Sequence, residues 1–161
     1  EKWAQLGRSA RIDRRHEGSS RRLVRRKIAR RHLTRSVDTN ILVRALVDDD
    51  AVQSPLAREL LAGPSIITAT VILETEWVLR SVYRWPRNVI ADALGGIINL
   101  PRATVFPPDI DWAVEQYRQA GDFADLTHLV VSKGASAFVT FDRAMANAVG
   151  PASPIPIEIL A

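Results

Sequence analysis

The sequence of 161 residues contains no cysteine and no long apolar run. Without cysteine, disulfides, zinc–thiolate sites and thiol nucleophiles are excluded, so any bound metal must be held by oxygen or imidazole ligands. No apolar run approaches the roughly 18 residues needed to cross a bilayer. We therefore expect a cytoplasmic protein without membrane association. Apolar residues make up 47% of the chain, which at this length indicates one globular domain.

The net charge of +4 combines two segments of opposite sign. Residues 1–36 contain 13 Lys/Arg and 3 Asp/Glu, a net of +10, whereas residues 37–161 contain 9 and 15, a net of −6. The first segment has too few apolar residues to form a core, so we expect residues 1–36 to be a basic, disordered extension. Three interpretations of it stay open: sequence upstream of the natural start, an arginine-rich arm that binds RNA or DNA phosphates, and a targeting peptide.

Residues 37–161 alternate short β-type runs with helical patterns. This alternation predicts an α/β fold with three layers (α/β/α) and a central, mostly parallel sheet of four to five strands. The expected strands lie near residues 37–40, 65–68, 103–106, 137–141 and 156–160. The expected helices lie near residues 41–47, 54–62, 70–84, 86–100, 111–120, 122–133 and 143–149, and Ser54 is the expected N-cap of the second helix.

Two acidic residues stand where predicted strands end, Asp38 and Asp142. Ligands of open parallel sheets bind beyond the carboxyl ends of the strands. If these two strands are neighbours, the two side chains converge there. Aspartate at a strand end is also a common turn and N-cap residue, so each position alone is equally compatible with a structural role.

Further acids lie on predicted helices. Glu74 and Glu76 fall on opposite margins of the apolar stripe of the helix at 70–84, and a helical wheel does not distinguish between them. Asp122 and Asp125 are three residues apart in the first turn of another helix, which fits an N-cap and the third helical position. Capping and ligand roles both stay open for this pair.

Four segments, in this order, resemble the motifs of the PIN-domain ribonucleases, specifically the VapC-type toxins of type II toxin–antitoxin systems. The segments are VDTNILVR at 37–44, VILETEWVLR at 71–80, DFADLTHL at 122–129 and VTFDR at 139–143. The resemblance covers residues 37 to about 150. It implies that the catalytic and metal-binding acids are Asp38, Glu74, Asp125 and Asp142, and it therefore favours Glu74 over Glu76.

The resemblance also implies supporting roles for Asn40, Thr140 and Asp122 beside these acids. Arg44 and Arg143 are candidates for substrate binding. Four carboxylates in one pocket would repel each other and raise their own pKa values, and a divalent cation removes that conflict. An all-oxygen site suits Mg²⁺ or Mn²⁺.

The function implied by the resemblance is a metal-dependent endoribonuclease that hydrolyses RNA phosphodiesters as a toxin. The implied partners are an RNA substrate, a cognate VapB-like antitoxin and a second copy of the chain. Two alternatives stay open. One is an Asp-based phosphatase-like hydrolase, although its usual second Asp is replaced by Asn40. The other is a catalytically silent PIN scaffold whose basic arm binds RNA or DNA.

Overall fold

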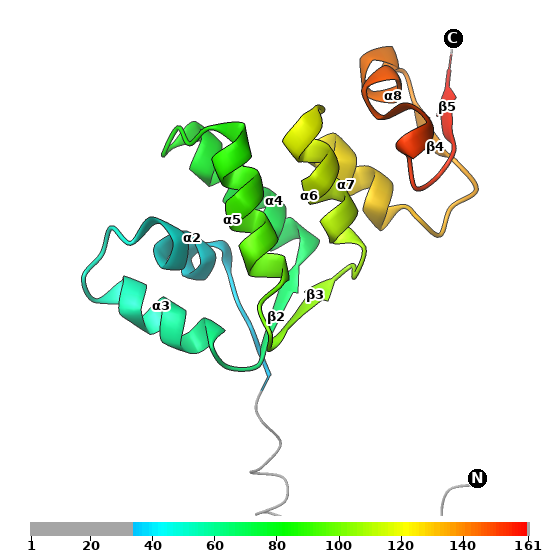
Figure 1. The fold of residues 1–161 in the computed structure, drawn as a ribbon. Coiled ribbons are helices and arrows are strands. Elements are labelled where there is room, and N and C mark those ends of the chain that lie inside the picture. Colours follow the sequence, from blue (N-terminus) through cyan, green and yellow to red (C-terminus); the bar gives the residue numbers. More distant parts are fainter. Residues whose placement is uncertain (1–33, 161) are drawn as a thin grey trace, which may run out of the picture. The chain divides into compact units, whose positions relative to one another are not determined.

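The computed structural model describes residues 34–160, so the interpretations of residues 1–33 lie outside it. Figure 1 shows the elements along the chain. They are β1 (Arg35–Ser36), α2 (Thr39–Val47), α3 (Gln53–Leu61), β2 (Ser65–Thr68), α4 (Ala69–Ser81), α5 (Arg87–Ile98), β3 (Ala103–Phe106), α6 (Ile110–Gln119), α7 (Phe123–Val131), β4 (Phe138–Thr140), α8 (Arg143–Val149), the short 3₁₀ helix η1 (Gly150–Ala152) and β5 (Ile157–Ile159). No helix in residues 34–160 combines the length and apolarity that a bilayer span requires.

The five strands are parallel, which confirms the predicted α/β fold, but they form two sheets rather than one. β2 lies between β1 and β3 in the first sheet, and β4 pairs with β5 in the second. Further main-chain hydrogen bonds join β4 to the β5 segment: Phe138 N donates to Pro156 O, and Leu160 N donates to Thr140 O. The strands that precede Asp38 and Asp142 are therefore not neighbours, contrary to the premise on which their convergence rested.

The first strand begins earlier than the sequence predicts. We expected it to open at Val37, but β1 spans Arg35–Ser36. Val37 continues the same pairing, since its N–H donates to Ile66 O at 3.1 Å, and its side chain is buried. The side chains of Arg35 and Ser36 are exposed, so the apolar pattern gave no sign of the main-chain hydrogen bonds made there. Asp38 follows directly and opens α2.

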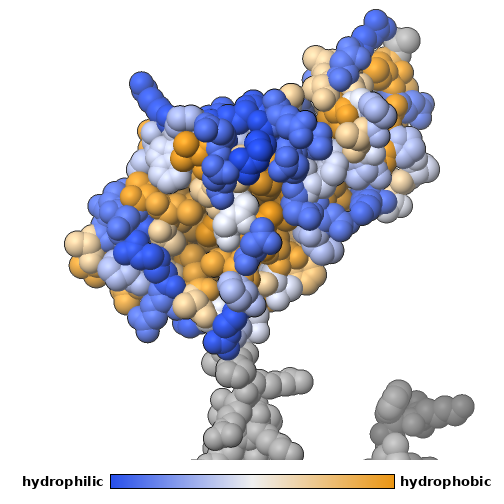
Figure 2. Space-filling view, viewed as in Figure 1, coloured by the Kyte–Doolittle hydropathy of each residue, from blue (hydrophilic) through white to orange (hydrophobic). Residues whose placement is uncertain are grey.

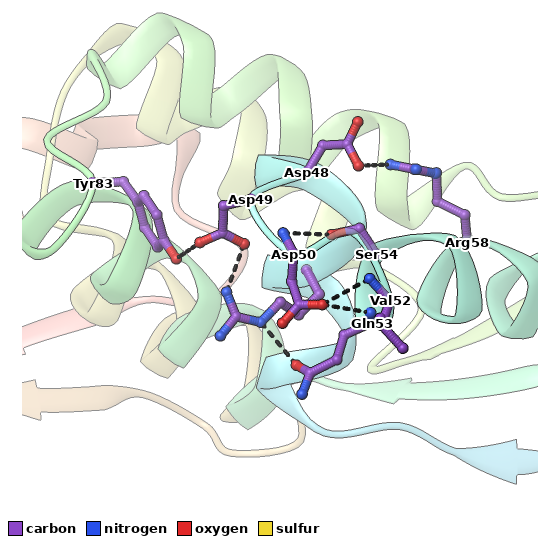
Figure 3. A network of polar contacts seen from close by, with 9 residues as sticks. Asp48, Asp49, Asp50, Val52, Gln53, Ser54, Arg58 and Tyr83 are labelled. Carbon is purple, nitrogen blue, oxygen red and sulfur yellow. Dashed lines mark hydrogen bonds and ion pairs between the residues drawn. The ribbon is translucent and has the colours of Figure 1, made fainter.

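The start of α3 also differs from the prediction that Ser54 is its N-cap. The helix begins at Gln53, and the carboxylate that accepts from its first N–H groups belongs to Asp50: Oδ1 accepts from Val52 N at 2.9 Å and from Gln53 N at 2.7 Å. Ser54 lies inside the helix and is fully buried. Asp50 and Ser54 are linked in the reverse sense, from the Asp50 N–H to Ser54 Oγ. Figure 3 shows both sets of bonds.

A polar network joins the loop between α2 and α3 to the end of α4 (Figure 3). Asp49 accepts hydrogen bonds from the Tyr83 hydroxyl at 2.7 Å and from Arg44, whose guanidinium also donates to Gln53. The hydrogen bonds from Tyr83 and Arg44 lower the pKa of Asp49. Backbone N–H groups of Gln53 and Val52 similarly lower the pKa of Asp50.

These lowered pKa values predict how stability responds to acid. A carboxylate whose pKa is lowered by folding stabilises the fold above its unfolded pKa, and that contribution is lost as the pH falls through the folded value. We expect the free energy of unfolding to drop as the pH is lowered through about 4 and below, and to drop less in Asp49→Asn. Urea titrations at a series of pH values measure this. Glu59→Gln, at an exposed position of α3, is the control, and an unchanged pH slope in Asp49→Asn would contradict the assignment.

The core forms where the helices pack on one another. α4 contacts α2, α5 and α7, and α6 packs between α5 and α7. One cluster of buried side chains runs through these elements, with Leu42, Ile67, Ile72, Leu79, Leu94 and Leu129 fully buried. Burial of these side chains fixes α4 and α7, the two helices that carry Glu74 and Asp125.

Candidate functional site

Three of the predicted site acids cap the helices that follow them. Asp38 Oδ1 accepts from Ile41 N at 3.1 Å, Asp122 Oδ1 from Ala124 N at 2.8 Å, and Asp142 Oδ1 from Ala144 N at 2.8 Å and Met145 N at 3.1 Å. N-capping and the positive end of the helix dipole favour the ionised carboxylate. Each cap uses Oδ1. Oδ2 of all three carboxylates is therefore without a hydrogen bond to any residue in 34–160, which leaves it open for another ligand.

Glu74 lies beside the start of α2. Thr39 Oγ1 donates to Glu74 Oε2 at 2.6 Å, and Thr39 is the residue next to Asp38. This bond ties α2 to α4 and brings Asp38 and Glu74 into one group, which we call the α2–α4 group. Glu74 is exposed, whereas Thr39 is buried. The predicted supporting residue Asn40 is exposed in the first turn of α2.

A second group consists of Asp122, Asp125 and Asp142, and we call it the α7–α8 group. Burial raises the pKa of Asp125, and the charges of Asp122 and Asp142 raise it further, while His128 acts in the opposite sense. The consecutive helices α7 and α8 therefore carry carboxylates whose charges act on one another. Thr140 Oγ1 accepts from Asp142 N at 2.9 Å, which places the predicted supporting threonine against this acid.

The two groups do not form one cluster of four acids. Within residues 34–160, no three acidic or imidazole side chains are gathered closely enough to hold a metal ion. The strand before Asp142, β4, pairs with β5 and not with β1, the strand before Asp38. A pocket of about 360 Å³ still connects the groups, because Glu74 and Asp122 both line it. The donor chemistry itself fits a hard cation, since every candidate ligand is a carboxylate oxygen.

Glu76 has a different role from Glu74, one that the helical wheel did not reveal. The sequence predicted Val71, Thr75, Val78, Leu79 and Val82 on one side of α4, with Glu76 at the margin of that stripe. In the structure the buried face includes Ile72, Thr75, Glu76 and Leu79, and Val82 is exposed. Only 2% of Glu76 is exposed. The predicted stripe is therefore right at Thr75 and Leu79 but wrong at Val82 and in leaving out Glu76, and Glu74 points away from the buried face.

Hydrogen bonds compensate the burial of Glu76. Its Oε1 accepts from Arg80 Nε and from the Tyr117 hydroxyl, each at 2.7 Å, and its Oε2 lies 3.5 Å from Arg80 Nη2. Burial, followed by the bond to Glu76, raises the pKa of Tyr117. Glu76 and Arg80 are four residues apart on a helix, a spacing that predicts an ion pair between them. Nothing in the sequence identified Tyr117 as a partner 41 residues away.

Two arginines, Arg87 and the substrate-binding candidate Arg44, are engaged within the fold. Arg87 donates from Nη1 to Tyr117 O at 2.8 Å and to Gly121 O at 2.7 Å, and its guanidinium lies 4.4 Å above the Tyr117 ring. These bonds hold the turn that precedes Asp122, where Gly121 has a φ of 86° that favours glycine. Arg44 is bound to Asp49 and Gln53. Arg143 is exposed at the start of α8, next to Asp142.

Comparison with known proteins identifies the family. The PIN-domain family model matches residues 36–150, a range that contains both groups of acids. A search of curated proteins and a search of solved structures each gave no significant match. PIN domains are generally metal-dependent nucleases and typically use divalent metal ions. The match spans most of the chain, and we conclude that this protein belongs to the PIN-domain family.

Proposed function

We propose that this protein is a magnesium-dependent endoribonuclease that acts as the toxin of a VapBC-type toxin–antitoxin pair. The family match supports nuclease chemistry. The acids of both groups stand in the four segments that resemble VapC-type toxins, and this supports the finer assignment.

The crowding of carboxylates around Asp125 carries the proposal. Burial raises the pKa of Asp125 most, and the charges of Asp122 and Asp142 raise it further, so the ionised carboxylate of Asp125 is held at a cost in free energy. Oδ2 of Asp122 and of Asp142 makes no hydrogen bond to the described residues. A divalent cation would relieve the repulsion and use these open oxygens. Structural capping needs only one oxygen of each carboxylate and does not explain the crowding.

Asp38, Glu74, Asp125 and Asp142 would hold the ion, in part through water, because Mg²⁺ keeps several waters when few carboxylates bind it. When bound, the ion supplies a water of lowered pKa and stabilises negative charge that develops on the phosphate. The chain orients the ligands. Thr39 holds Glu74, and the helix caps hold Asp38 and Asp142. Thr140 accepts from Asp142 N, and Asn40 would support Asp38. Mn²⁺ is the alternative ion.

Removal of the metal is the first test. The full chain with Mg²⁺ is expected to cleave single-stranded RNA internally, EDTA to abolish cleavage, and added Mg²⁺ or Mn²⁺ to restore it. Gel analysis of end-labelled RNA measures this and separates internal cuts from trimming of the ends. Cleavage that persists in EDTA would contradict the metal-dependent mechanism. Growth arrest on expression of the chain, compared with a variant at Asp142, tests the toxin role.

Besides the acids, this protein has a second surface that the proposed antitoxin could bind. Figure 2 shows apolar surface between α3 and α5. A pocket of about 650 Å³ lies there, lined largely by apolar residues such as Leu46, Leu61 and Ile97, with Arg58 and Arg102 also in its lining. An apolar segment of the antitoxin fits this pocket, while an Arg of its C-terminal part would pair with the carboxylates and block the site. The proposed homodimer is tested by light scattering.

A further inference from the structure

Trp77 is a large apolar side chain that is not part of the buried core cluster. It lies on α4 one turn after Glu74, and 53% of it is exposed. The buried face of the same helix is formed by other residues, among them Ile72 and Leu79. Tryptophan carries one of the largest apolar surfaces of any residue, so leaving it in water forgoes a stabilising contact. An unburied Trp beside candidate site acids indicates a ligand contact.

The side chains around Trp77 could bind both the base and the phosphate of a nucleotide. The pocket of about 360 Å³ is lined by Trp77, Arg80 and the candidate site acids Glu74 and Asp122. Glu76, which is paired with Arg80, also lines it, together with Thr70, Leu73 and Ala124. An indole provides a flat face on which any base can stack. A guanidinium provides donors and positive charge for a phosphate. The two acids place both features at the edge of the proposed reaction site.

Arg80 is held in a fixed position with donors to spare. Its Nε and Nη2 face the buried Glu76 carboxylate, which the Tyr117 hydroxyl holds from the other side. The Arg80 side chain is nevertheless 49% exposed, and its Nη1 makes no hydrogen bond to any residue in 34–160. A guanidinium anchored in this way needs to lose little side-chain entropy when it binds a phosphate.

We propose that Trp77 is the stacking platform for one base of a single-stranded RNA substrate, and that Arg80 binds the adjacent phosphate next to Glu74 and Asp122. The choice of RNA as the ligand rests on the proposed function. The RNA must be single-stranded where it contacts Trp77. In a duplex each base is stacked between its neighbours, so no face is free for an indole. A second copy of this chain is the competing occupant of the exposed indole.

Binding of RNA without cleavage tests the proposal. The full chain is titrated, in EDTA, into a short fluorescein-labelled single-stranded RNA of mixed sequence, and anisotropy gives the affinity. Because a base stacked on an aromatic ring adds to the affinity, Trp77→Ala should bind this RNA about 10-fold more weakly than the wild type. Trp77→Phe retains a smaller ring and should lose less. Leu56→Ala removes an exposed apolar side chain of α3 outside this pocket and is the matched control.

Two further signals separate stacking from a merely structural effect. RNA should quench indole emission of the wild type more than that of Trp77→Phe, which retains the other three Trp residues. If cleavage occurs, Trp77→Ala should raise KM more than it lowers kcat, because the base is bound alike in the ground state and the transition state. Circular dichroism checks that each variant folds.

Each outcome decides between the alternatives. Equal affinity of wild type and Trp77→Ala, or no binding of single-stranded RNA by the wild type, would overturn the proposal. Dissociation of a dimer by Trp77→Ala with unchanged RNA affinity, seen by light scattering, would assign the indole to contact between copies. Trp77-dependent binding without any metal-dependent cleavage would keep the binding site and reject the nuclease. Metal-dependent cleavage that is unchanged in Trp77→Ala would support the nuclease and reject the role of Trp77 in binding RNA.

Discussion

Asp142→Asn should reduce metal-dependent RNA cleavage by about 100-fold or more while leaving the fold intact. The amide oxygen of Asn can still accept from Ala144 N and Met145 N, so α8 keeps its cap. What is lost is the negative charge and the anionic ligand oxygen. Asp38→Asn should behave in the same way, since Asp38 caps α2 through one bond to Ile41 N. Initial rates of RNA cleavage at saturating Mg²⁺ measure both.

Asp92→Asn is the matched control for both variants. Asp92 is an exposed carboxylate on α5 that pairs with Arg118, and it lies outside both groups of acids. Its replacement should leave cleavage unchanged. Urea denaturation must show that Asp38→Asn and Asp142→Asn remain folded. Full activity in either of these variants would remove that acid from the proposed site.

The double variant tests whether the α2–α4 group and the α7–α8 group serve one reaction. If Asp38 and Asp142 act on the same ion, either substitution alone already abolishes the function, and the second adds little. If the groups act independently, the two losses multiply. The separation of the groups in this structure makes the measurement informative, because geometry alone does not join them.

Much of the fold was predictable from local patterns. β2 and β3 lie at the predicted residues, and α8 spans the predicted range from Arg143 to Val149. Apolar runs and helical periodicity depend on neighbours in sequence, which the sequence displays directly. The N-cap role expected of Asp122 is confirmed for the same reason, since a cap concerns residues two or three positions apart.

What the sequence could not supply were pairings between distant segments. The two-residue strand β1 has exposed polar side chains, and its register with β2 rests on main-chain hydrogen bonds. The choice of β5 rather than β1 as the partner of β4 likewise depends on long-range geometry. It decides whether Asp142 meets Asp38, and local patterns leave it open. For the candidate site, the sequence therefore named candidate acids, whose role stays a prediction, but could not indicate how they are grouped in space.

Burial of Glu76 escaped prediction for a related reason. A carboxylate is rarely buried without compensating partners, so a pattern of single residues assigns it to the surface. Its partners are Arg80, one turn away, and Tyr117 on another helix. The contact with Tyr117 is made inside the protein, and it could be predicted only from the packing of α4 against α6.

This network predicts the largest loss of stability from a single polar substitution outside the proposed metal ligands. In Glu76→Ala the Tyr117 hydroxyl stays buried without its acceptor, at a cost of roughly 1–3 kcal/mol. Arg80 is half exposed and can turn to water, so its freed charge adds little. Glu76→Gln retains an oxygen that can accept from Tyr117 and should lose less. Urea denaturation of the full chain gives the free energies of unfolding.

The control is Glu115→Ala, which breaks an exposed ion pair with Arg118 and should cost well under about 1 kcal/mol. Tyr117→Phe removes the hydroxyl itself, so in the Tyr117→Phe background Glu76→Ala should cost less stability, and the difference measures the hydrogen bond.

Arg87 packs on the same Tyr117 ring and holds Gly121, the residue before Asp122. Destabilising Tyr117 should therefore loosen Asp122 as well, and hydrogen exchange at the start of α7 should rise in Glu76→Ala. A Glu76→Ala variant as stable as Glu115→Ala would contradict this account of α4, and with it the reason that Glu74, two residues earlier, faces outward.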